Sequence, residues 1–142
     1  GLETQGPGGD EGGDMKVLVT GSRDWDDSFL VDVVLWGLFT RHAGLFTVAH
    51  GAARGADTMA HNWVDLYGSR LGASEARYPA DWEKDGKAAG PIRNQRMLDE
   101  FKPDLVVAFK NDMDPELKRG GTEHMVRIAK KAGVPVVVVR HG

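Results

Sequence analysis

The sequence of 142 residues contains no cysteine. Disulfide bonds, thiolate metal sites and cysteine nucleophiles are therefore excluded, and a cytoplasmic location is compatible with this composition and is the one we expect. No apolar run approaches the roughly 20 residues of a membrane span, and no signal peptide opens the chain, so we expect no membrane partner. With 41% hydrophobic and 27% charged residues, the composition is typical of one globular domain.

The chain also has little net charge, −3 at pH 7 from 18 basic and 21 acidic residues. Residues 1–14 (GLETQGPGGDEGGD) hold four of the acids and no base, and their glycine-rich composition predicts a disordered leader or a remnant of cloning before Met15. Without this leader, 17 acids face 18 bases and the net charge becomes +1. We therefore predict one near-neutral domain over residues 15–142, without the large positive field that a nucleic-acid partner requires.

Several motifs of known mechanism are missing as well. There is no GxGxxG, GKS or GKT, which argues against conventional binding of whole NAD and against ordinary NTPase activity. There is also no GxSxG and no HExxH. Asp57 and His61 share a helix face and could form a metal site with His50, but hydrogen-bonded, partly buried histidines are commoner, so we predict no metal and no cofactor.

Hydrophobic periodicity predicts alternating strands and helices. Short apolar runs predict strands at residues 16–20, 45–49, 105–109 and 134–139, and residues 75–78, before Pro79, are a candidate for a short third strand. Apolar stripes predict helices at residues 29–42, 57–71 (ending near Gly68 or Gly72), 91–101 and 122–132. Because continuous apolar strands between helices are typical of a parallel sheet covered on both faces, we predict a three-layer, Rossmann-like α/β fold of about five strands.

Unusual residues gather after four of the predicted strands, where folds of this class bind their ligands. Glycines let a ligand approach the backbone, helix starts favour anions, and arginines add charge-assisted hydrogen bonds. The predicted ligand-binding residues after the first and second strands are Gly21, Ser22, Arg23, Trp25, Gly51, Arg54, Gly55 and Asp57. Those after the third and fourth strands are Asp81, Trp82, Gly120, Gly121 and Thr122.

Some of these residues have alternative explanations. Arg93 and Asn94 are also predicted ligand-binding residues. They open a predicted helix, where basic residues oppose the helix dipole, which indicates either a nearby anion or merely a solvated turn. Thr122 is expected to cap the last helix, which is compatible with a site there. Trp25 and Trp82 lie in loops, where they could stack on a base or only cover the sheet.

Four segments then resemble a known family in sequence and in order. The segments MKVLVTGSRDW, HGAARGADTMAHNW, YPADWEKDGKAAGPIRNQRML and GGTEHMVRIAKKAGVPVVVV are similar to the YspA-type, cpYpsA-related branch of the SLOG superfamily. The resemblance covers Met15 to Val139 and implies a Rossmann-like domain that binds nucleotide-derived ligands. The superfamily includes the LOG phosphoribohydrolases, the DNA-processing protein DprA and nucleotide-sensing domains. LOG-like domains often pair through helices, so a homodimer is compatible with the resemblance.

One motif departs from the LOG pattern. LOG enzymes carry PGGxGTxxE, whereas this chain reads RGGTEHMV, so that Glu123 stands earlier than the glutamate of that pattern. The first hypothesis is therefore a module that senses or sequesters a nucleotide, such as an ADP-ribose-like ligand or a nucleoside monophosphate. The second is a nucleotide N-glycosidase, for which Arg93 and Glu123, with Asp57 as an alternative carboxylate, are the candidate catalytic residues. The third is DprA-like binding of single-stranded DNA, which the near-neutral charge disfavours.

Overall fold

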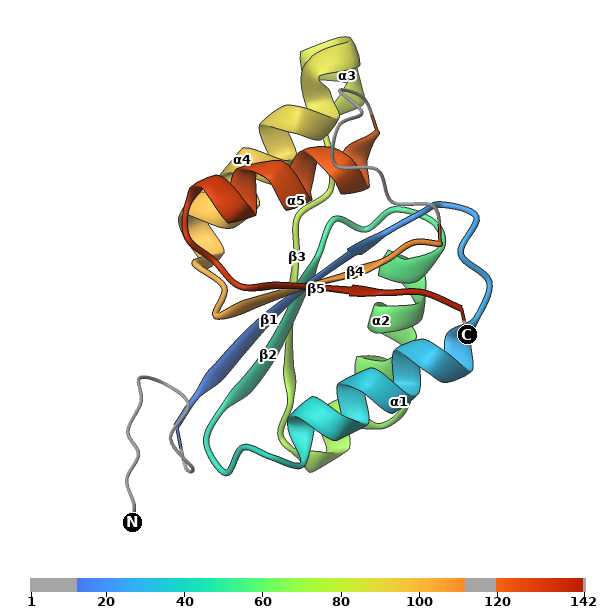
Figure 1. Ribbon diagram of the computed structural model, residues 1–142, viewed down its shortest axis with the longest axis vertical. Helices are drawn as coiled ribbons and strands as arrows, with labels where there is room; N and C mark the ends of the chain where they lie inside the picture. The colour runs from blue at the N-terminus through green and yellow to red at the C-terminus, as the bar shows by residue number, and fades with distance from the viewer. Residues whose placement is uncertain (1–12, 112–119, 142) are drawn as a thin grey trace.

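The computed structural model describes residues 13–111 and 120–141 (Figure 1). Within these ranges five strands form one parallel sheet in the order β3–β2–β1–β4–β5. The strands are β1 (Met15–Gly21), β2 (Phe46–His50), β3 (Ser74–Arg77), β4 (Leu105–Phe109) and β5 (Val136–Val139). The predicted Rossmann-like α/β fold is confirmed.

Helices cover both faces of the sheet and make three layers (Figure 1). One face carries α1 (Ser28–Phe39) and α2 (Ala56–Leu66), and the other carries α4 (Ala89–Phe101) and α5 (Gly121–Lys131). Successive side chains of β1 pack on opposite faces of the sheet. Val17 and Val19 belong to one core cluster with Trp63, whereas Leu18 belongs to another with Met97. This alternation explains why the strand reads as a continuous apolar run.

The helices differ most from the prediction in two places. The helix predicted over residues 57–71 ends at Leu66, and a 3₁₀ turn follows from Gly68 to Leu71, so the earlier of its two predicted ends is the better one. Gly68 is a poor helix former, which favours an end there. A short helix, α3 (Trp82–Asp85), and a 3₁₀ turn over Gly86–Ala88 occupy the segment that we expected to be a loop.

The predicted leader lies largely outside the described residues. Of its last two residues, which are described, Asp14 accepts a hydrogen bond from the Leu45 backbone N–H at 2.9 Å. The extent of the domain over residues 15–142 stays a prediction. In the part of the chain that the structure describes, no helix combines the length and the apolarity that crossing a membrane requires.

The strand order creates a switch point between β1 and β4. The chain begins in the middle of the sheet, adds β2 and β3 on one side, and then adds β4 and β5 on the other. At the carboxyl end of this central pair, Gly21 lies beside Phe109, and the Ser22 N–H donates to the Phe109 carbonyl at 3.1 Å. The connections after β1 and β4 therefore leave the sheet in opposite directions, which opens a crevice at this edge.

Candidate functional site

A cavity of about 560 Å³ lies at the switch point. Its walls come from the ends of β1 and β4, the turn after β2, and the starts of α4 and α5. Twelve residues predicted for the site line it: Gly21, Ser22, Arg23, Gly51, Asp57, Trp82, Arg93, Asn94, Gly120, Gly121, Thr122 and Glu123. The volume is within the range of small-molecule pockets.

The lining is rich in positive charge. Among the described residues, the cavity is lined by the cationic side chains of Arg23, Lys87, Arg93 and Lys110, against the carboxyl groups of Asp57 and Glu123. The N-terminus of α5 adds the partial positive charge of its backbone N–H groups. The cavity is therefore suited to an anion, although the chain as a whole is nearly neutral.

Arg93 connects three segments of the chain. Its Nη1 donates to the carbonyls of Gly51 at 2.5 Å and Tyr78 at 3.2 Å, and its Nε donates to Asn94 Oδ1 at 2.9 Å. A Cβ at Gly51 would overlap the guanidinium, so only glycine permits this approach. Burial, together with the charge of Arg23, lowers the pKa of Arg93 although Asp57 opposes this. Two like charges thus lie close together at one cavity wall.

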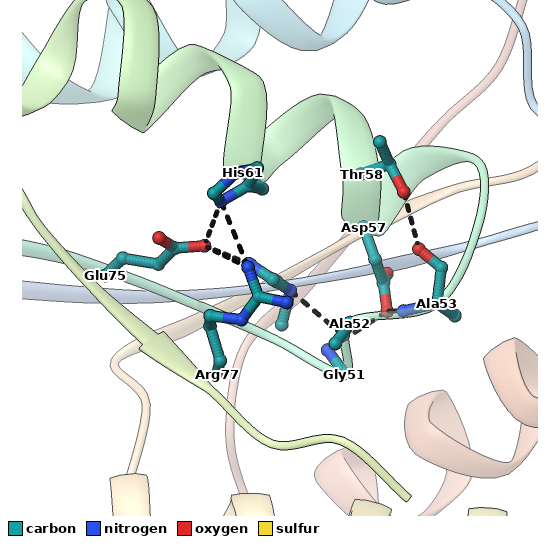
Figure 2. A network of polar contacts seen from close by, with 9 residues as sticks. Gly51, Ala52, Ala53, Asp57, Thr58, His61, Glu75 and Arg77 are labelled. Carbon is teal, nitrogen blue, oxygen red and sulfur yellow. Dashed lines mark hydrogen bonds and ion pairs between the residues drawn. The ribbon is translucent and has the colours of Figure 1, made fainter.

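Asp57 is a buried carboxyl group that borders the cavity beside the turn after β2. Its side chain is 5% exposed, and Oδ2 accepts the backbone N–H groups of Gly51 at 3.0 Å and Ala53 at 3.2 Å (Figure 2). Burial raises the pKa of Asp57, even though these hydrogen bonds and the charge of Arg93 act in the opposite direction. The carboxyl group therefore shapes the turn after β2 and also borders the cavity.

The start of α5 faces the same cavity. The helix begins at Gly121 with Gly120 as N-cap, so the prediction that Thr122 caps it is wrong, because Thr122 lies inside the first turn. Gly120 has φ 101°, and a Cβ there would meet the Glu123 carboxylate. Glu123 is 2% exposed, and its Oε2 lies 3.5 Å from Lys110 Nζ. An ion pair between a buried carboxylate and a partly exposed lysine thus stands where this motif departs from the LOG pattern.

Asn94 links α4 to α5. Its Nδ2 donates to the Gly121 carbonyl and lies equally close to His124 Nδ1, both at 3.1 Å. Burial and the charge of Arg127 lower the pKa of His124, which favours the neutral ring that can accept this bond. Since the amide oxygen already accepts from Arg93, Asn94 serves the architecture of the wall.

The two loop tryptophans have different environments. Trp82 is 50% exposed and lines the cavity, with the Arg23 guanidinium 5.8 Å from its ring. Trp25 is 4% exposed and does not line the cavity, because Phe109 and His141 cover its ring at centroid distances of 5.6 and 4.5 Å. Trp25 therefore covers the sheet, whereas Trp82 offers a face to a ligand.

Three further residues predicted for the site lie off the cavity. Arg54 is exposed, Gly55 packs against the backbone of the Ser22–Arg23 loop, and Asp81 caps α3 by accepting the Lys84 N–H at 3.1 Å. Conversely, Lys87 and Lys110 line the cavity but were not predicted to do so. The position of Lys110 directly after β4 is the signal that could have identified it.

A separate polar cluster could supply metal ligands. Among the described residues, one potential ligand atom each from His50, His61 and Glu75 lies within 4.8 Å of the others. However, His50 Nδ1 accepts the Ala52 N–H at 3.0 Å, so the neutral ring carries its proton on Nε2, which lies 2.5 Å from Glu75 Oε2. A metal on Nε2 would require the proton on Nδ1, opposite the Ala52 N–H. The geometry therefore favours a hydrogen-bonded cluster over a metal site.

The fold and the site define a Rossmann-like domain with a cationic pocket at its switch point. The family described as YspA, cpYpsA-related SLOG matches residues 15–84. The "Gene 61 protein" of Mycobacterium phage D29 is similar to this chain, with 38% identity over 125 residues that cover 86% of this chain and 94% of that protein. This chain therefore belongs to the YspA, cpYpsA-related SLOG family. Membership suggests a nucleotide-related function, and the name of the phage relative specifies no ligand or activity.

Proposed function

We propose that the cavity binds an anionic, nucleotide-derived ligand, either an ADP-ribose-like compound or a nucleoside monophosphate, and that the protein senses or sequesters it. The observation that carries this proposal is the set of four cationic side chains and a helix N-terminus around one cavity of about 560 Å³. Phosphate oxygens accept hydrogen bonds from such groups. The half-exposed ring of Trp82 on the same wall suits a base.

Calorimetric titration tests this proposal with AMP, other nucleoside monophosphates, ADP-ribose, NAD and a short single-stranded oligonucleotide. We expect Arg23→Ala to weaken binding about tenfold or more, because it removes a charge-assisted contact. Arg54→Ala makes the same change at an exposed arginine off the cavity, and should leave affinity unchanged. Equal losses in both variants would contradict a localised site. Binding of the oligonucleotide alone, with a steep salt dependence, would favour the DNA-binding alternative.

A second candidate function is hydrolysis of an N-glycosidic bond. It is favoured by two buried carboxyl groups, Asp57 and Glu123, that border the same cavity. A carboxylate there could stabilise an oxocarbenium-like transition state or orient water. Chromatography of AMP or ADP-ribose after incubation tests this function. Release of base by the wild type and its loss in Glu123→Gln would support hydrolysis, whereas intact ligand would leave binding as the function.

A further inference from the structure

The turn after β2 is held from two sides. On the cavity side, Asp57 accepts the N–H groups of Gly51 and Ala53, and Arg93 donates to the Gly51 carbonyl. On the other side, the Ala52 N–H donates to His50 Nδ1 at 3.0 Å. Ala52 has φ 59°, in the left-handed region that costs a non-glycine residue energy. This strained turn therefore depends on the contacts that surround it.

Glu75 determines which nitrogen of His50 can accept. The same carboxylate oxygen lies 2.5 Å from His50 Nε2 and 2.8 Å from His61 Nδ1. Burial disfavours the charge of Glu75, but the hydrogen bonds from the two histidines outweigh it and lower the pKa of Glu75, so it is an ionised acceptor. An acceptor at Nε2 keeps the proton there and leaves Nδ1 free to accept from Ala52.

The cluster also connects the molecular surface to the turn. His50 is buried, whereas His61 is one-third exposed and Arg77 about half exposed. In Figure 2, His61, Glu75 and Arg77 converge beside α2, while Asp57 reaches the turn from the same helix. A change of protonation in the cluster can therefore reach the cavity through a few hydrogen bonds.

We infer that His50 is a positioning residue for the cavity. Its Nε2–H tautomer, fixed by Glu75, keeps the turn in the conformation in which the turn binds Asp57 and Arg93 and the cavity binds an anion. This inference rests on the anion site proposed above. In the other tautomer the proton on Nδ1 would face the Ala52 N–H, and the bond at 3.0 Å would be lost.

The titratable and charged groups that face His50 come from three elements, and they are Glu75 and Arg77 of β3, Asp57 and His61 of α2, and Arg93 of α4. Variants that keep all of these groups and change only His50 isolate its contribution.

Two substitutions separate the two nitrogens of the ring. In His50→Asn the amide oxygen takes the place of Nδ1 and can still accept from Ala52. In His50→Gln the amide nitrogen lies near the place of Nε2, which keeps the contact to Glu75 but removes the acceptor. ADP-ribose is the probe for calorimetry, because it is one of the ligands proposed for the cavity.

At pH 8 we expect His50→Asn to bind ADP-ribose within about twofold of wild type, and His50→Gln to bind about three- to tenfold more weakly. The inference is overturned if His50→Gln binds as tightly as wild type, or if His50→Asn loses as much affinity as His50→Gln.

A second measurement requires no ligand. The ¹⁵N shifts of the His50 ring should report the Nε2–H tautomer and stay unchanged when Zn²⁺ is added. The Gly51 and Ala53 amide shifts should move in His50→Gln and much less in His50→Asn. An Nδ1–H tautomer, or Zn²⁺ bound at Nε2, would overturn the inference. If wild type fails to bind ADP-ribose at every pH, the proposed site is wrong for this ligand, and the shifts alone decide whether His50 holds the turn.

Discussion

Replacing Arg93 by methionine removes three hydrogen bonds and one charge while keeping an unbranched side chain. Two of the bonds reach the backbone carbonyls of Gly51 and Tyr78, and the third reaches Asn94. A hydrogen bond to a charged group contributes about 1.5–3 kcal/mol, but carbonyls beside an open cavity regain water. We therefore expect a total loss of about 1–3 kcal/mol, which lowers Tm by about 3–10 °C for a domain of this size.

The effect on binding should be larger than the effect on stability. Arg23 and Arg93 lie close enough for Arg23 to help burial lower the pKa of Arg93, so an anion between them relieves repulsion as well as accepting hydrogen bonds. Loss of one partner should weaken ADP-ribose binding about 10- to 100-fold. Calorimetric titration measures this change at a temperature at which the variant stays folded.

Arg96→Met is the matched control. Arg96 lies on the same helix, is about half exposed, and pairs with Glu100 at 3.4 Å as an exposed i, i+4 ion pair. Such pairs contribute little, so Tm should change by less than about 2 °C and affinity should stay the same. The reasoning is refuted if Arg93→Met binds ADP-ribose as wild type does, or if both variants lose affinity equally.

Three further substitutions test the other walls and the core. Burial raises the pKa of Asp57, so the folded state binds this proton more tightly than the unfolded state does. The resulting stabilisation is present at acid pH and is lost as the pH rises from the ordinary carboxyl range through the folded pKa. In urea unfolding at a series of pH values, Asp57→Asn should not show this loss of stability. Trp82→Ala should weaken adenine-containing ligands about 5- to 100-fold in calorimetry but leave ribose 5-phosphate binding unchanged, and an equal loss for both would contradict stacking. Trp25→Ala should cost about 3–5 kcal/mol in chemical unfolding without changing the affinity of the folded protein, and a stability near wild type would contradict its packing role.

Much of the fold was predictable because its signals are local. Each strand except β3 is a short apolar run, and each long helix has an apolar stripe, so their order along the chain predicts a parallel sheet with two covered faces. The short helix over Trp82–Asp85 was missed because four residues are too few to show a helical period. Its one local signal is Asp81, which accepts the Lys84 N–H as a cap.

The features of the site that could not be predicted from the sequence have a different cause. Trp25 and Trp82 both follow strands in polar, glycine-containing sequence, and nothing local distinguishes them. What buries Trp25 is Phe109 and His141, more than 80 residues away along the chain. Likewise, the contact between His50 and Glu75 depends on the register of β2 against β3, which only the assembled sheet provides.

Glu123 shows how a chain can depart from the LOG pattern and still place a carboxylate at the cavity. Glu123 stands earlier on α5 than the glutamate of that pattern, and its carboxylate folds back over Gly120, where the missing Cβ and φ of 101° make room for it. There it lies 3.5 Å from Lys110, which offsets its charge. A carboxylate paired in this way is a weaker nucleophile or base than an unpaired one, because its charge is already stabilised. The ion pair leaves the charges of Arg23, Lys87 and Arg93 at the cavity, which agrees with the proposed binding of an anion.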